Sequence, residues 1–229
     1  MRYLVRRKLN PDCLSKYNYA TDAWRTRPEN GFPQVPSEAD RTQIWKALNA
    51  MQRNVCAYCE GRLETGSHIE HFAKRSSYRH LTFEWDNLFG SCSRDDCCGH
   101  YKDSSHSRYS NYSLQDLIKP DVDNPWDFLV FGSNRRVSVR DGLSPAERKK
   151  GQTTIDVLNL DSSFHIPERV SKYYLVRDIL LLIEEEPCEE VISLVIDEVK
   201  AILPQLDTYS SAALQHVPSE IFQQATACP

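Results

Sequence analysis

The sequence has no long apolar run, and this absence limits where the chain can work. Hydrophobic residues make up 40% of its 229 positions, and no stretch approaches the roughly 18 consecutive apolar residues that a membrane-spanning helix needs. The basic residues 1–8 lead into Asn-Pro-Asp rather than into the apolar segment of an export signal. We therefore expect a cytoplasmic protein without a membrane partner.

An excess of basic charge is also missing. The net charge is -4 at pH 7, which argues against indiscriminate nucleic-acid binding because phosphate contacts need basic residues in excess. The charge is unevenly placed, since residues 1–27 carry seven basic and two acidic residues, whereas residues 178–198 hold eight acidic residues and no basic one. The N-terminal segment is a candidate for phosphate contacts or an ordinary solvated face.

The eight cysteines do not have the distribution of a disulfide framework. Five of them lie within 43 positions: Cys56, Cys59, Cys92, Cys97 and Cys98. In a chain without an export signal, this clustering favours metal binding over disulfide formation. Cys13, Cys188 and Cys228 lie far from the cluster, and we assign no function to them.

The spacing of the clustered cysteines predicts a structural zinc ion. Cys56 and Cys59 can bind one tetrahedral zinc from a single turn, and Cys92 with either Cys97 or Cys98 supplies the second pair. We favour Cys98, so that residues 93–96 form a small insertion in the second knuckle. Four thiolates leave no open coordination position, so the chemistry must lie elsewhere.

The residues between and after these knuckles carry the groups that phosphodiester hydrolysis needs. The reaction requires a base for water, a divalent cation for the phosphate and a group that orients the base. His71 is the candidate base, and Glu70 is the candidate ligand of a catalytic Mg²⁺ or Mn²⁺. Asn87 is predicted to orient the imidazole, with a helix N-cap as its alternative role. His100 is the predicted second cation ligand.

Several neighbouring polar residues receive weaker assignments. Three histidines are assigned to the surface: His68, His80 and His106. Lys74, Arg75 and Lys102 flank the predicted site, where they either bind phosphate or solvate a surface.

Four spaced motifs resemble the retron-associated HNH endonuclease family, the PtuB component of Septu-type antiphage systems. They are Cys-Ala-Tyr-Cys at 56–59, Ile-Glu-His-Phe at 69–72, Trp-Asp-Asn-Leu-Phe-Gly-Ser-Cys at 85–92 and Cys-Gly-His-Tyr-Lys-Asp at 98–103. The resemblance covers about residues 1–180. It implies an α+β fold, with a zinc-stabilised ββα-metal (HNH) nuclease core and helical segments at both ends.

One position departs from the common HNH pattern. The residue after the last knuckle cysteine is usually His or Asn and ligates the catalytic metal, but Gly99 stands there in this chain. His100 follows one position later. The prediction of His100 as a ligand therefore needs a local shift, or Cys97 as the zinc ligand.

The resemblance implies a toxic effector that cleaves nucleic acid together with a PtuA-type ATPase. In retron systems a reverse transcriptase with its RNA–DNA hybrid would be a further partner. Two alternatives stay open. The same site can cut RNA, such as a tRNA loop, because the chemistry does not use the 2′-hydroxyl. A zinc-ribbon module that only binds nucleic acid or protein would need the cysteines but not the residues between them.

The predicted organisation has four parts. Residues 1–36 form a basic segment and a turn-rich connector, and residues 37–110 form the nuclease module, entered by a helix that Ser37 caps. Residues 111–160 contain a hairpin over 126–139 and a helix from Pro145 to about Leu158. Residues 161–229 contain amphipathic helices over 173–183 and 189–203, which we expect to pack on each other and on the nuclease core. An added hypothesis is that they dock the ATPase.

Overall fold

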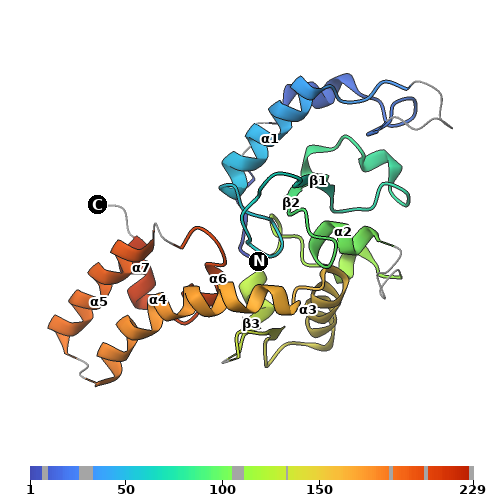
Figure 1. Ribbon diagram of the computed structural model, residues 1–229. Helices are drawn as coiled ribbons and strands as arrows, with labels where there is room; N and C mark the ends of the chain where they lie inside the picture. Colours follow the sequence, from blue (N-terminus) through green and yellow to red (C-terminus); the bar gives the residue numbers. More distant parts are fainter. Residues whose placement is uncertain are drawn as a thin grey trace.

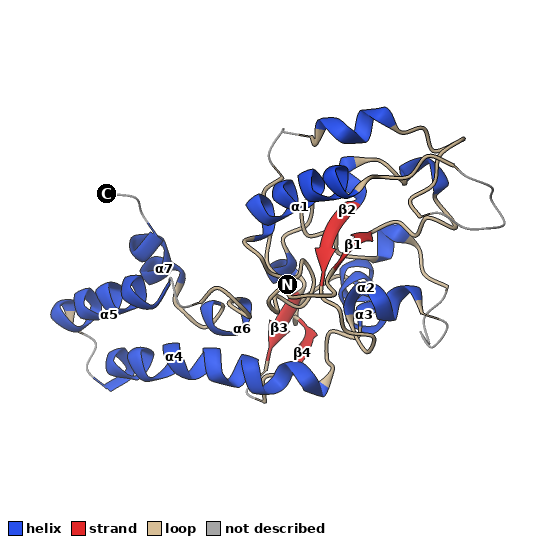
Figure 2. Ribbon diagram, turned by 45° about the horizontal axis from the view of Figure 1, so that its top comes forward, coloured by secondary structure: helices blue, strands red, loops and turns tan. Residues whose placement is uncertain are grey.

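The computed structural model describes residues 1–6, 10–25, 33–104, 111–132, 134–185, 188–203 and 206–226. These residues form a mixed α+β protein with two small antiparallel sheets. Figures 1 and 2 show both sheets together with α1, α2 and α3, while α4 leads away to α5 and α7. The basic positions 7, 8 and 27, most of the connector, His106 and Cys228 lie outside the described residues.

Helix α1 (Glu38–Gln52) confirms the predicted entry into the cysteine-rich part. The Ser37 hydroxyl accepts a hydrogen bond from the backbone N–H of Asp40, whose carboxylate accepts one from the Ser37 N–H. This reciprocal capping box satisfies two N–H groups that the first turn leaves unpaired.

The last residue of α1 fixes this helix to the first sheet. The buried Gln52 amide donates to the Gly90 carbonyl at 2.9 Å and accepts from the Gly90 N–H at 2.7 Å. A Cβ atom at Gly90 would lie 2.9 Å from the Trp45 ring. Gly90 is therefore the residue that lets the helix approach the strand this closely.

The first sheet pairs β1 (His68–His71) with β2 (Leu88–Ser91) in antiparallel register, so that Glu70 lies opposite Phe89. The short helix α2 (Cys98–Asp103) follows, which gives a β-β-α order. Because side chains alternate along a strand, His68 and Glu70 share one face and His71 points to the other.

The second sheet pairs β3 (Leu129–Phe131) with β4 (Val137–Val139), and α3 (Pro145–Leu158) packs against β4. The predicted hairpin and helix are confirmed, although β3 is shorter than expected because Pro125–Asp127 forms a 3-10 turn. The main apolar core lies between these elements and the cysteine-rich turn, with Tyr58, Phe89, Ile118 and Leu158 fully buried.

The C-terminal helices are α4 (Ile166–Glu185), α5 (Glu189–Ile202), α6 (Ser211–Leu214) and α7 (Ser219–Thr226). Two of them were predicted, and α4 begins seven residues before the expected Tyr173. Their apolar side chains form a separate cluster that includes Val176, Val195, Val199 and Ile221. The two predicted stripes thus pack on each other and on α6 and α7. No helix among the described residues is long and apolar enough to span a membrane.

Candidate active site and metal centre

The fold brings four of the five clustered cysteines together. The sulfur atoms of Cys56, Cys59, Cys92 and Cys98 lie within 4.8 Å of one another, and all four side chains are buried. A tetrahedral zinc with sulfur ligands at about 2.3 Å separates them by about 3.8 Å, so the 4.0 Å between Cys59 and Cys92 fits such an ion. The cluster can hold a metal ion, and its donor set suits zinc.

The electrostatics of the cluster also fit a cation. Burial and the neighbouring thiols raise the pKa of Cys98 well above its ordinary value, so four adjacent thiolates need a positive ion to stay ionised. Cys97 belongs to a second group, in which its sulfur lies within 4.8 Å of Cys98 and a ring nitrogen of His165. The four-sulfur group contains Cys98, the residue that we favoured over Cys97 from the sequence.

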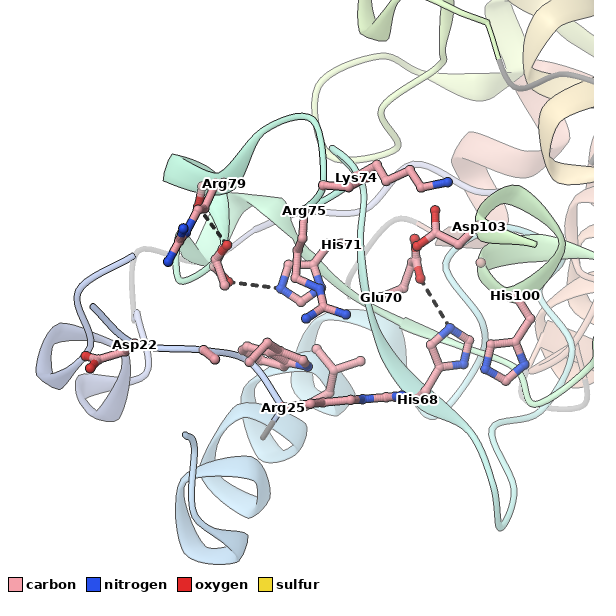
Figure 3. Close-up of a pocket in the computed structure, with 16 residues that line it drawn as sticks. Asp22, Arg25, His68, Glu70, His71, Lys74, Arg75, Arg79, His100 and Asp103 are labelled. Carbon is pink, nitrogen blue, oxygen red and sulfur yellow. Dashed lines mark hydrogen bonds and ion pairs between the residues drawn. The ribbon is translucent and has the colours of Figure 1, made fainter. Parts of the chain in front are cut away.

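A cleft of about 530 Å³ lies beside the first sheet. Its polar lining combines residues of β1 and α2 with basic side chains: His68, Glu70, His71, Lys74, Arg75, Arg79, His100, Asp103 and Arg25 (Figure 3). Four basic side chains around a few carboxylates suit a phosphodiester backbone. The cleft therefore collects the predicted base and the predicted cation ligands in one place.

Glu70 is buried and ionised. Its Oε1 atom lies 2.7 Å from Nζ of Lys102, and its Oε2 atom lies 3.2 Å from Nε2 of His68. Burial alone would raise the pKa of Glu70, but Lys102 and His68 outweigh this effect and lower the pKa to about 2. Lys102 is itself buried and also donates to the His71 carbonyl at 3.0 Å. The expectation that Lys102 binds phosphate or solvates the surface was therefore wrong.

His71 is held in one tautomer by the backbone. Its Nε2 atom lies 2.9 Å from the Thr82 carbonyl oxygen, which can only accept, so Nε2 carries the proton and Nδ1 of the neutral ring keeps the lone pair. Burial, with a smaller contribution from Arg75, lowers the pKa of His71 to about 3. The Trp24 ring packs nearly perpendicular to the imidazole, with the two ring centroids 4.6 Å apart.

Asn87 does not make the predicted hydrogen bond to the imidazole. Its side-chain oxygen accepts from the Ala73 N–H at 2.7 Å, and its amide nitrogen donates to the Leu81 carbonyl at 2.9 Å. The Thr82 carbonyl takes the place that Asn87 was expected to fill. Asn87 instead ties together the two ends of the loop that carries Thr82, so its effect on His71 is indirect.

His100 lines the cleft and contacts His68 and Asp95. Its ring stacks on the His68 ring, with centroids 3.8 Å apart and planes 7° from parallel, and its Nδ1 atom lies 3.3 Å from the exposed Asp95 carboxylate. In Figure 3 the His68 ring lies between Glu70 and His100. His68, expected to be a surface histidine, is thus the imidazole that contacts Glu70. Its position two residues before Glu70 on a strand was the signal in the sequence.

The described basic residues near the N-terminus mainly serve the fold. Arg6 pairs with Asp121 at 2.6 Å and donates to the carbonyl oxygens of Trp85 and Leu88. Arg2 pairs with Glu60 at 3.2 Å. Only Arg25, among the described basic residues of this segment, lines the cleft.

Fold and site together define an α+β protein with a buried four-cysteine cluster that can hold a metal ion, beside a β-β-α unit and a basic cleft. No protein-family model matches the chain. It is similar to Septu protein PtuB of Bacillus thuringiensis, with 32% identity over 152 residues that cover 59% of this chain and 53% of that protein. The chain thus spans about half the length of this curated relative. The similarity confirms the resemblance to the Septu PtuB-type family; the retron association stays a prediction.

Proposed function

We propose that this chain is a metal-dependent HNH-type endonuclease that acts as an effector of Septu-type antiphage defence. The observation that carries the proposal is the cleft, where adjacent residues of β1 supply a neutral imidazole and an ionised carboxylate among basic side chains. The similarity to Septu protein PtuB supports the role in defence.

In this proposal His71 is the general base. Because the Thr82 carbonyl accepts from Nε2–H, the lone pair on Nδ1 is the one that takes a proton from water as it attacks the phosphorus. The lowered pKa keeps the ring neutral throughout the physiological range, so Nδ1 carries a lone pair there. Transfer of the proton to His71 turns the ring into an imidazolium, which the nearby Glu70 charge favours.

Glu70 would hold the divalent cation, which supplies charge neutralisation at the scissile phosphate and the leaving oxygen when it is bound. The carboxylate fits this role because it is ionised and lines the cleft. The Lys102 ammonium at 2.7 Å already balances part of its charge. We therefore expect Mg²⁺ or Mn²⁺ to bind weakly and to exchange, while zinc stays in the cysteine cluster.

The C-terminal helices provide a surface for a partner, for which we propose a PtuA-type ATPase. Large apolar side chains are exposed on α4 and α5: Tyr174, Leu175, Leu181, Leu182 and Leu194. Acidic residues such as Glu190, Asp197 and Glu198 lie on the same pair of elements. A surface of this kind repels nucleic acid and complements a basic protein surface.

The decisive experiment incubates the full chain, alone and with its ATPase, with labelled DNA and with total RNA in the presence of Mg²⁺. We expect cleavage of one of these substrates and a loss of about 10² to 10⁴ in rate for His71→Ala. His80→Ala, which removes an exposed imidazole outside the cleft, is the matched control.

Each outcome of this experiment separates the candidate functions. Cleavage of RNA alone would establish the ribonuclease alternative with the same site. Binding without cleavage of either substrate by the zinc-loaded complex would favour a binding module. Wild-type turnover by folded His71→Ala would show that His71 is not the base.

A further inference from the structure

The cleft contains a pair of side chains suited to a cation, His68 and Glu70. The sequence pattern predicts a different pair, Glu70 and His100. His68 and Glu70 are two residues apart on β1, so both side chains point to the same face of the strand. Nε2 of His68 and Oε2 of Glu70 lie 3.2 Å apart, as the dashed line in Figure 3 marks. Adjacent ligands of an octahedral cation at about 2.1 Å lie about 3 Å from each other. The two atoms therefore already have the separation of neighbouring ligands.

The lack of a side chain at Gly99 leaves room beside Glu70 for the His68 imidazole of β1. A Cβ atom on Gly99 would lie 2.6 Å from Oε2 of Glu70 and 2.8 Å from Nε2 of His68. No side chain at position 99 fits while these two groups keep their places. The His68 ring thus occupies the space into which a side chain of residue 99 would project.

His100 has a different relation to the same pair. It stacks face to face on His68 and approaches Asp95, whereas the ion pairs of Glu70 are with His68 and Lys102. The Nδ1 atom of His68 has no hydrogen-bond partner among the described residues, although ligating histidines usually fix their ring through that nitrogen. Stacking on His100 holds the His68 ring in its plane instead.

We propose that His68 is the second protein ligand of the catalytic cation, in place of the side chain missing at Gly99, and that His100 positions the His68 ring. The proposal rests on the proposed cation site at Glu70. It moves the ligand from α2 to β1 and leaves the cation in the same cleft, close to His71.

The test is Mn²⁺ binding to the zinc-loaded full chain, measured by electron paramagnetic resonance without substrate. Titration gives the affinity, and pulsed spectra detect a nitrogen atom bound to Mn²⁺. We expect His68→Ala to weaken binding at least about tenfold and to abolish the nitrogen signal. His100→Ala should weaken binding less and keep the signal. His80→Ala is the matched control, and retained zinc with an unchanged melting temperature shows that each variant is folded.

The variants separate failure of this inference from failure of the proposed function. Glu70→Gln should also weaken Mn²⁺ binding. If Glu70→Gln weakens it while His68→Ala keeps both affinity and nitrogen signal, His68 is not a ligand and only this inference fails. If only His100→Ala loses the nitrogen signal, the second ligand is His100 on α2 and not His68. If the wild type binds no Mn²⁺, or Glu70→Gln binds it normally, the cation site and this inference both fail.

Discussion

Asn87 shows how a residue can support the proposed base, His71, without a hydrogen bond to it. Its side chain spans the loop from Ala73 to Leu81, and the next residue, Thr82, presents the carbonyl that fixes His71. The motif predicted that Asn87 belongs to the site but not through which bond it acts. That bond depends on how the loop folds back on itself, which spacing along the chain does not specify.

The first prediction concerns this loop. Asn87→Ala removes the acceptor of the Ala73 N–H and the side-chain donor to the Ala73 carbonyl, so we expect a loss of about 1–3 kcal/mol in the free energy of unfolding. The displaced Thr82 carbonyl should also slow cleavage at temperatures where the variant is still folded. Chemical denaturation and cleavage assays measure the two effects. Asn111→Ala, at an exposed position, is the control, and equal behaviour of both variants would contradict the role of Asn87.

Spacing along the chain does not specify tertiary contacts, and this also explains why the sequence did not predict the roles of Lys102 and His68 correctly. Lys102 was placed at the surface because its partner, Glu70, is 32 positions away and meets it only after α2 packs on β1. His68 was predictable in part, since residues two apart on a strand share a face. The position of its ring beside Gly99 was not predictable, because it depends on how closely α2 approaches β1.

At the scale of elements, the cysteine cluster joins the turn before β1 to Cys92, directly after β2, and to Cys98, the first residue of α2. Small elements of this kind bury little apolar surface, and a structural zinc site can contribute on the order of 10 kcal/mol to folding. The cluster is therefore expected to decide whether the β-β-α unit forms.

The second prediction distinguishes the adjacent cysteines in this cluster. Cys98→Ser removes a sulfur from the four-sulfur group and should lower the zinc content and the thermal stability strongly. Cys97→Ser should keep about one zinc per chain and melt close to the wild type. Elemental analysis and thermal unfolding provide the readouts. The reverse order would show that Cys97 is the ligand, and a folded wild type without zinc would exclude the site.

Local signals predicted the starts of α1 and α3 well. Ser37 and Ser144 each begin a capping box, and the helices start at the next residue in both cases. The start of α4 was missed, because Pro167 is compatible with a first helical turn as well as with a loop. The strands of the first sheet have four residues each, which is too short for a periodic pattern, so the motifs alone indicated them.

At the scale of the whole molecule, Glu60 connects the cysteine turn to the C-terminal segment. Its buried carboxylate lies 2.7 Å from the Met1 ammonium and accepts from the Ser210 hydroxyl at 2.9 Å and the Ser211 N–H at 3.2 Å. The backbone of Glu60 has a φ of 66°, a conformation in which glycine would be less strained. The side chain therefore has a structural role that glycine could not fill.

The third prediction follows from the charge of Glu60. Burial would raise its pKa, but the Met1 ammonium and Arg2 outweigh burial and lower the pKa from 4.5 to about 2. A lowered folded-state pKa stabilises the protein above about pH 4.5, and this contribution is lost as the pH falls towards 2. Glu60→Gln should thus lose on the order of 3 kcal/mol at pH 7 and show a flatter acid dependence. Denaturation curves from pH 7 to pH 3 measure this, and parallel curves for both proteins would contradict it.

The contacts of Glu60 also determine how the partner surface can be tested. Truncation after Leu160 would remove Ser210 and Ser211 and leave the buried Glu60 carboxylate without two of its donors. If such a fragment did not bind the partner, the cause could be its destabilised fold rather than the loss of a docking surface. Substitutions on the surface of the intact chain avoid this problem.

The last prediction places the ATPase on the exposed apolar side chains of α4 and α5. Leu182 on α4 is 39% exposed and Leu194 on α5 is 50% exposed, and neither belongs to the apolar cluster that joins these helices. The double variant Leu182→Glu and Leu194→Glu should therefore keep its unfolding midpoint but copurify with the ATPase at a strongly reduced level, since a buried interface does not tolerate unpaired charge. Val122→Glu, at a 65% exposed site in the part that contains the sheets, is the matched control. If the double variant copurifies at full strength, these helices do not dock the ATPase through this face and their apolar cluster serves the fold alone.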